Sequence, residues 1–178
     1  IMNLAKGLQQ LGHEITVVIY GQDQDETFVD NGITFYKIRN IKFKGFSWWL
    51  TQMKIQKLLR HLVDSGKIDL VEVADWTGIS SNLKLNCPLV IKLHGSDTYF
   101  CHLDARPVKK VNFRREQKAL MTADAWSSVS EYVAKITQKI FGFEQDFQVI
   151  PNGIDLEKFS INQTLNQEKP QNLYLVRF

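Results

Sequence analysis

Short runs of β-branched and aliphatic residues alternate along this chain with longer segments of helical periodicity, and that alternation constrains the fold more than any other feature. Strands are predicted for six apolar runs, at 15–20, 33–38, 70–73, 88–93, 125–129 and 147–150. Helices are predicted where apolar residues recur at helical spacing, at 2–11, 46–63, 108–122 and 130–140. Short buried strands separated by helices predict an α/β fold, with a Rossmann-like parallel sheet and helices on both of its faces.

The remaining segments predict loops and a domain boundary. Residues 21–32 are acidic and rich in turn-forming residues, so a loop is expected there. Beyond residue 155 the chain becomes polar and rich in Asn and Gln, and 173–178 then has the pattern of a strand. We therefore expect one domain over 1–155, followed at 156–178 by a linker and the first strand of a second, truncated domain.

Composition narrows the class of protein. The chain has 178 residues, of which 44% are hydrophobic, and such a chain forms a core without disulfides. No apolar run approaches the ~20 residues of a membrane-spanning helix, and two cysteines are too few for a disulfide framework, so a cytoplasmic setting is expected. The chain opens inside a helical pattern without an initiator Met. We expect an incomplete gene product that lacks the first strand and the Gly-rich turn with which this fold normally begins.

The net charge of +3 conceals two basic segments. Residues 37–62 contain seven Lys or Arg and no acidic residue, and a second basic cluster at 106–118 contains Glu116 as its one acid. Such clusters suit phosphates, anionic lipids or nucleic acids, and they also occur as solvated helix faces. Nucleic acid is not expected as a partner, because neither an RNP-like nor a helix-turn-helix pattern accompanies them.

Polar residues follow two of the predicted strands, at the end where ligands bind in parallel α/β sheets. Strand 88–93 runs directly into His94, Gly95 and Ser96. The glycine permits close approach of a ligand to the backbone, and the imidazole is expected to point into the crevice. The alternative is a histidine that only satisfies a loop carbonyl.

The strand at 70–73 carries Glu72 and leads to Asp75 and Trp76. A carboxylate beside an exposed indole is a common sugar-binding combination, although Trp76 could instead belong to the core. Ser130 precedes a predicted helix, where it could bind phosphate or sugar oxygens or merely cap the helix. No nucleophile elbow, Walker loop or metal-ligand cluster is found.

Several motifs occur together in an order that resembles a known enzyme family. They are a helix end and strand at 11–18, Glu-Val-Ala-Asp-Trp-Thr-Gly at 72–78, Lys-Leu-His-Gly-Ser at 92–96, a segment at 123–130, and Val-Ile-Pro-Asn-Gly-Ile-Asp at 149–155. The chain resembles the N-terminal half of family 4 glycosyltransferases, which have a two-domain GT-B fold. The departures are the missing Gly-rich loop, the missing C-terminal domain with its paired glutamates, and Val176 in place of the usual glycine.

The resemblance implies a retaining hexosyltransferase that moves a sugar from a nucleotide diphosphate sugar to a saccharide, lipid-linked or small acceptor, without a cofactor or a bound metal. It implies that His94 faces the donor sugar as the catalytic residue. The residues expected to bind substrate are Glu72, Asp75, Trp76, Gly95, Ser96, Ser130, Asn152 and Gly153. The fragment alone is expected to be inactive, and a role in carbohydrate or polysaccharide biosynthesis is expected for the whole enzyme. A non-catalytic sugar- or lipid-binding module and a GT-B nucleotide-sugar epimerase are the alternatives.

The helix at 46–63 has a second apolar face beside the one that packs on the sheet. Trp49 and Met53 lie on this second face next to Lys57 and Arg60. Aromatic and cationic residues side by side suit an anionic lipid interface, so we expect candidate peripheral contact with the inner face of the membrane. Packing under the preceding loop or against a neighbouring chain is the alternative.

Overall fold

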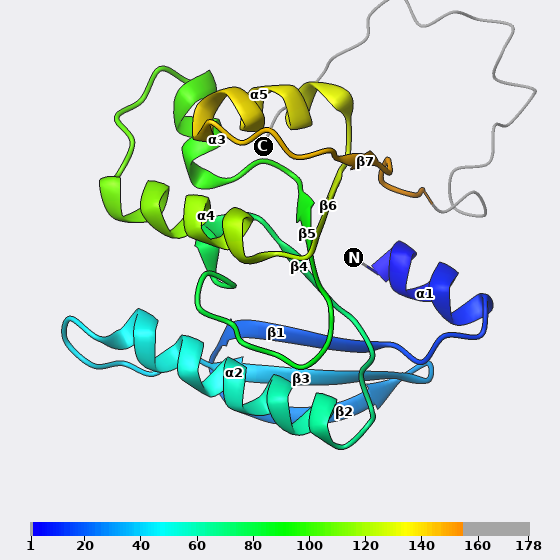
Figure 1. Cartoon of the computed structure of the whole chain (residues 1–178). Coiled ribbons are helices and arrows are strands. Elements are labelled where there is room, and N and C mark those ends of the chain that lie inside the picture. Colours follow the sequence, from blue (N-terminus) through cyan, green and yellow to red (C-terminus); the bar gives the residue numbers. More distant parts are fainter. Residues whose placement is uncertain (1, 155–178) are drawn as a thin grey trace, which may run out of the picture.

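The computed structural model describes residues 2–154, which form an α/β structure (Figure 1). The linker and the first strand of a second domain that are expected at 156–178 lie outside the described residues. The elements in chain order are α1 (Met2–Gln10), β1 (Thr16–Gln22), β2 (Glu26–Asp30), β3 (Ile33–Arg39), α2 (Ser47–Asp64), β4 (Val71–Ala74), the 3₁₀ turn η1 (Trp76–Gly78), β5 (Leu89–Leu93), α3 (Asp97–Leu103), α4 (Lys110–Thr122), β6 (Ala125–Ser128), α5 (Glu131–Phe141) and β7 (Gln148–Val149).

The strands form two sheets. One sheet has four parallel strands in the order β4-β5-β6-β7, and the other has the order β1-β3-β2, in which β1 is parallel and β2 antiparallel to β3. Parallel strands connected by helices confirm the predicted α/β class. The expected single sheet is divided into two, because no strand among residues 2–154 pairs with both β1 and β4.

Apart from the 3₁₀ turn η1, two elements were not expected from the sequence. The acidic segment contains the strand β2, which forms a hairpin with β3 through Asn31 and Gly32, both with positive φ (49° and 77°). That pair of dihedrals is typical of a two-residue hairpin turn. β2 is an edge strand of which only Phe28 is half-buried, so its apolar pattern is weak. The second unexpected element is the short helix α3, which follows Ser96.

The helix α2 packs against both sheets. Its buried residues Ile55 and Leu59 belong to a core cluster that also contains Ile38 of β3 and Val71 of β4. A second cluster, which includes Ile91, lies between the strands β5 and β6 and the helices α4 and α5. Figure 1 shows these helices beside the four-stranded sheet. The apolar face predicted for α2 is therefore the one that packs.

The turn η1 lies directly on α4. Gly78 has φ +63°, and a Cβ at this position would stand 2.4–2.6 Å from backbone atoms of Arg115 and Glu116. Only glycine permits this close approach, because any larger residue would push the helix away. The contact brings the segment after β4 and the buried face of α4 to the carboxyl end of β5.

Candidate active site at the carboxyl ends of the parallel strands

The ends of four parallel strands are joined by backbone hydrogen bonds around His94. The N–H of Asp75 after β4 donates to the carbonyl of Lys92 (3.2 Å), and the N–H of Val129 after β6 donates to the carbonyl of Leu93 (3.1 Å). The N–H of Ile150 after β7 donates to Ser128 (2.8 Å). These contacts fix the segments that follow the strands, and they place most of the predicted site residues along one edge of the sheet.

His94 is the exposed titratable residue on the segment that follows β5. Partial burial, with the nearby charge of Lys92 as a further cause, lowers the pKa of the His94 imidazole below its ordinary value of 6.5. The imidazole is therefore neutral at neutral pH, with one nitrogen that donates and one that accepts hydrogen bonds. Such a group can bind a sugar hydroxyl in either direction.

Gly95 permits the turn of the backbone after His94. Its φ is +107°, and a Cβ would stand 2.9–3.0 Å from the rings of Tyr99 and Phe100. Both the dihedral angle and the packed rings require a glycine here. The segment is thus closely packed on its inner side, although His94 itself is exposed.

Asp75 is buried beneath this segment with 5% of its surface exposed. The N–H of His94 donates to Oδ1 of Asp75 (3.1 Å), and the N–H of Gly95 donates to Oδ2 (3.2 Å). Burial raises the pKa of the Asp75 carboxyl to about 6, although these two hydrogen bonds oppose the shift. The carboxylate predicted to bind sugar faces the protein's own backbone.

Ser96 and Glu116 hold the start of α3. The hydroxyl of Ser96 accepts the N–H of Tyr99 (3.2 Å) and caps the helix. Glu116 reaches across from α4, where Oε2 accepts the N–H of Thr98 (3.2 Å). Glu116 is 2% exposed, and burial raises the pKa of its carboxyl. Asp75, Ser96 and Glu116 line one small cavity of about 10 Å³.

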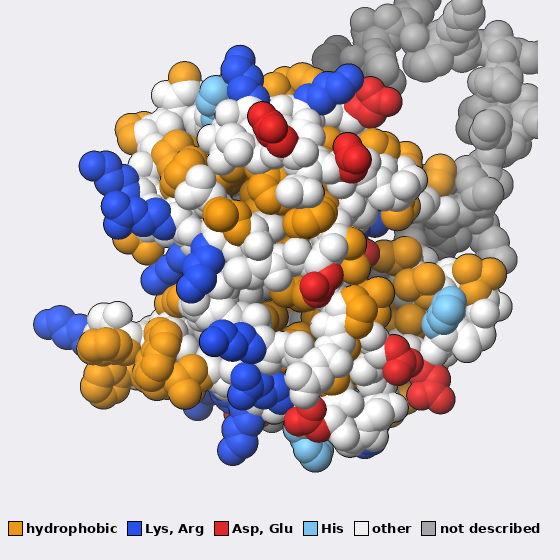
Figure 2. Space-filling model, in the orientation of Figure 1, with side chains coloured by type: hydrophobic (Ala, Val, Ile, Leu, Met, Phe, Trp, Pro, Cys, Tyr) orange, Lys and Arg blue, Asp and Glu red, His pale blue; other side chains and the backbone are white. Residues whose placement is uncertain are grey.

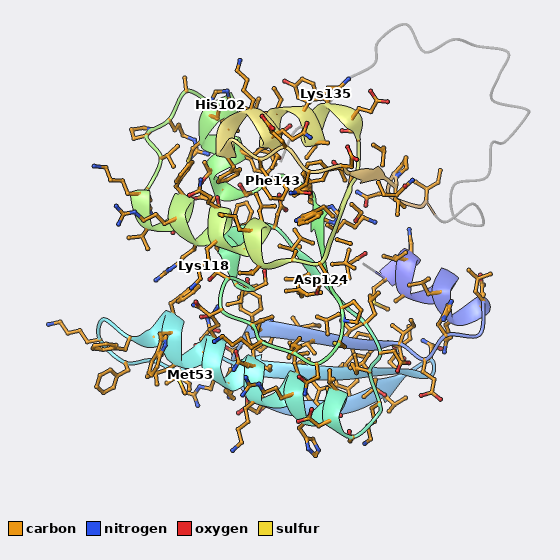
Figure 3. All side chains as sticks on the ribbon, viewed as in Figure 1. Met53, His102, Lys118, Asp124, Lys135 and Phe143 are labelled. Carbon is orange, nitrogen blue, oxygen red and sulfur yellow. The ribbon has the colours of Figure 1, made fainter. Side chains whose placement is uncertain are left out.

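The sequence did not single out Glu116, which was noted only as an acid within a basic segment. The signal that could have identified it is its spacing from Ala119 and Leu120, which are buried on the same face of α4. The neighbouring basic residues have structural contacts as well. The guanidinium of Arg115 lies 3.6 Å from the ring centroid of Trp48, and Nζ of Lys118, labelled in Figure 3, donates to Oδ1 of Asn82 (2.5 Å).

The other predicted site residues differ in their distance from the His94 segment. Trp76 is 47% exposed, and its ring centroid lies 6.4 Å from that of Phe100, so the indole borders the same edge. Ser130 is half-buried and its hydroxyl accepts the N–H of Val133 (3.2 Å), which is the capping role. Glu72 is exposed within β4, and no hydrogen bond among the described residues joins it to His94.

Asn152 and Gly153 are exposed after β7. The carbonyl of Gly153 accepts a hydrogen bond from Nδ2 of Asn3 on α1 (3.3 Å). This contact brings the Pro-Asn-Gly segment next to the first turn of α1, and both lie on the side of the sheet where the strands end.

The candidate membrane contacts lie on a separate surface. Phe43, Phe46, Trp49 and Met53 are 50–58% exposed, and we call these four residues the aromatic patch. Figure 2 shows hydrophobic side chains gathered beside basic ones at the lower left, over the loop before α2, and Figure 3 labels Met53 on that helix. Lys57 and Arg60 are also exposed on α2, and Nε of Arg60 donates to the carbonyl of Lys84 (2.9 Å).

Comparison with known proteins decides the family. A model of glycosyltransferase family 4 matches residues 1–158. The chain belongs to glycosyltransferase family 4. It is also 28% identical over 170 residues to an uncharacterized glycosyltransferase of Methanocaldococcus jannaschii, with 89% of this chain and 42% of that protein covered.

The family membership confirms the resemblance and the transferase class expected from the sequence. The chain spans less than half the length of its archaeal relative. The edge that carries His94, Asp75 and Trp76 remains the candidate active-site surface of this chain.

Proposed function

We propose that this chain forms the acceptor-side half of a retaining glycosyltransferase that uses a nucleotide diphosphate sugar as donor and a saccharide or lipid-linked acceptor. In the transfer, the bond between the anomeric carbon and the diphosphate oxygen breaks, and the nucleotide diphosphate leaves with the bonding electrons. The acceptor hydroxyl oxygen bonds to the same carbon on the same face, and its proton passes to the departing diphosphate oxygen. Neither a cofactor nor a metal is part of the proposal.

The observation that carries the proposal is the exposed, neutral imidazole of His94 at the carboxyl end of β5, followed by a glycine with positive φ. A neutral imidazole donates a hydrogen bond to a sugar hydroxyl or accepts one from it, and it adds no full charge of its own beside the charged diphosphate. The indole of Trp76 offers an apolar face along the same edge, against which sugar C–H groups can stack.

We further propose that the aromatic patch contacts an anionic membrane surface, where a lipid-linked acceptor would be found. The distribution of ion pairs supports this proposal. Glu26 neutralises Lys37 (2.8 Å), and Asp25 neutralises Lys54 (2.6 Å). The exposed Lys42 and Lys44, which flank Phe43, have no ion pair among the described residues. Residues 2–154 contain no helix that is long and apolar enough to cross a membrane.

The proposed reaction is tested with the full-length enzyme and a panel of UDP-, GDP- and ADP-sugars. Release of free nucleotide diphosphate identifies a donor, and NMR of the anomeric proton of the product gives its configuration. The proposal expects the product to keep the anomeric configuration of the donor. An inverted product would contradict the retaining mechanism, and isomerised nucleotide sugar without transfer would favour the epimerase.

A further inference from the structure

Two buried acids, Asp75 and Glu116, share one cavity beneath the segment that carries His94. They are 5% and 2% exposed, and they come from different elements, the segment after β4 and the helix α4. Burial of a carboxylate is unfavourable unless its oxygens receive hydrogen bonds. Both oxygens of Asp75 and one oxygen of Glu116, Oε2, accept backbone N–H groups of the segment from His94 to Thr98.

The contacts of Asp75 are specific in geometry. Each carboxylate oxygen accepts one N–H, with His94 on Oδ1 at 3.1 Å and Gly95 on Oδ2 at 3.2 Å. Glu116 accepts the N–H of Thr98 at 3.2 Å, farther along the same segment. A carboxylate with two acceptor oxygens thus fixes the orientation of two consecutive peptide groups, and the second acid fixes the segment where α3 begins.

The backbone of this segment needs such acceptors. Buried N–H groups require partners, and Gly95 is buried in a closely packed segment, where a Cβ would stand 2.9–3.0 Å from the rings of Tyr99 and Phe100. Because the Cα of His94 lies between the two peptide groups that Asp75 holds, the direction of its side chain depends on this carboxylate.

We propose that Asp75 is a positioning residue for sugar transfer, which orients the imidazole of His94 by binding the backbone of His94 and Gly95 and does not contact the sugar. This proposal rests on the proposed role of His94. It differs from the sequence-based expectation that Asp75 binds substrate, because both of its oxygens already accept hydrogen bonds and its carboxylate is buried.

The test uses Asp75→Asn, which keeps the shape of the side chain and removes one acceptor. The amide oxygen can accept one N–H, but the amide nitrogen then faces the other N–H as a second donor. In the full-length enzyme we expect kcat for the donor to fall roughly 10- to 100-fold, because a small displacement of a catalytic group has an effect of that size. The KM for the donor is expected to stay within about twofold, since no contact with the sugar is lost.

Asp124→Asn is the matched control. Asp124, labelled in Figure 3, accepts the N–H of Leu89 at the other end of the same strand β5 (2.8 Å), so the same substitution removes the same kind of contact away from His94. We expect it to leave kcat unchanged. A loss of kcat equal to that of Asp75→Asn would overturn the positioning role.

Amide hydrogen exchange in the 178-residue chain gives a readout that does not depend on activity. Asp75→Asn should accelerate exchange at His94 and Gly95, whereas Asp124→Asn should not. If Asp75→Asn raises KM and leaves the exchange of both amides unchanged, then Asp75 acts on the sugar directly and the proposal is wrong. If the exchange changes as expected but His94→Ala retains full turnover, the proposed role of His94 fails while the contact of Asp75 with the backbone stands.

The unmodified chain provides a test if Asp75→Asn does not fold. The amide proton shifts of His94 and Gly95 should both follow a single titration as the carboxyl of Asp75 becomes protonated, because a charged acceptor moves an amide resonance downfield. Independent or absent titration of the two amides would contradict the shared carboxylate.

Discussion

At the scale of single residues, the clearest prediction concerns His94. Replacing His94 with Ala in the full-length enzyme should lower kcat by roughly 10²–10³-fold, the size expected when one preorganised polar contact to a transition state is lost. The KM should change less, because the contact is made mainly near the transition state. Steady-state release of nucleotide diphosphate measures both constants.

His102→Ala provides the control for this prediction. His102 is an exposed histidine in the last turn of α3, and it is labelled in Figure 3. Its replacement removes an imidazole from the same region without affecting the candidate site, so turnover should remain unchanged. Equal turnover in both variants would remove His94 from the proposed mechanism.

Asp75 gives a prediction for the pH dependence of stability. Its pKa is about 6 in the folded chain, against the ordinary value of 3.8 that applies to the unfolded chain, so the folded state binds the proton more readily. The buried charge therefore destabilises the fold above about pH 6, and this penalty is relieved as pH falls from 6 toward 3.8. Relative to Asp75→Asn, the free energy of unfolding of the wild type should rise by about 1 kcal/mol as the pH falls from about 7 to about 5.

Urea unfolding of both chains at the two pH values measures this difference. Glu116 and His94 lie near Asp75 and are present in both chains, so their own titration largely cancels in the comparison. A constant difference between wild type and variant across this range would contradict a raised pKa for Asp75.

At the scale of elements, the local signals in the sequence were sufficient for most helices and strands. As expected, α5 begins after Ser130, whose side chain caps the helix, and ends before Gly142, which has a φ of +61°. β2 was missed although Asn31-Gly32 is a strong hairpin signal, because the exposed strand that precedes it lacks an apolar pattern. The ends of elements are marked locally, whereas an exposed edge strand depends on its partner.

The partners of polar side chains could not be predicted in the same way. The sequence placed Asp75 and His94 each after a predicted strand, and the structure joins them. It could not tell that the carboxylate faces the backbone of His94, because that depends on the burial of the turn η1 against α4. The buried position of Glu116 likewise depends on how α4 packs.

The aromatic patch at the start of α2 gives the prediction for this element. The chain should bind vesicles of anionic phosphatidylglycerol more strongly than neutral phosphatidylcholine vesicles, and salt should weaken the binding. Trp49→Ser with Met53→Ser should reduce sedimentation with anionic vesicles without unfolding the chain, since both side chains are about half exposed.

Met121→Ser is the control for the patch. Met121 lies on α4 and is 70% exposed, so its substitution removes a comparable apolar side chain from another surface. Its binding to vesicles should match that of the wild type. Equal and negligible sedimentation of the unmodified chain with both kinds of vesicle would leave the aromatic patch as a packing surface.

At the scale of the whole molecule, three apolar clusters stabilise two sheets. One cluster lies between α1 and the three-stranded sheet, and another lies between the four-stranded sheet and the helices α3, α4 and α5. The third contains Ile38 of the three-stranded sheet, Leu89 of the four-stranded sheet and Leu59 of α2. Because the sheets are not joined by strand pairing among residues 2–154, this third cluster is the principal apolar connection between them.

The connection predicts how the molecule loses stability when one side chain of α2 is shortened. Leu59→Ala removes a side chain that is 5% exposed, which typically destabilises a core by about 2–5 kcal/mol. Since Leu59 joins the two sheets, its loss should weaken their coupling, and hydrogen exchange should accelerate more in residues 16–39 and 47–64 than in residues 125–141. Leu120→Ala, in the cluster of the four-stranded sheet, should give the opposite order. Mass spectrometry of peptic fragments from both variants decides the question, because equal acceleration throughout the chain in each variant would mean that the two sheets open as one cooperative unit.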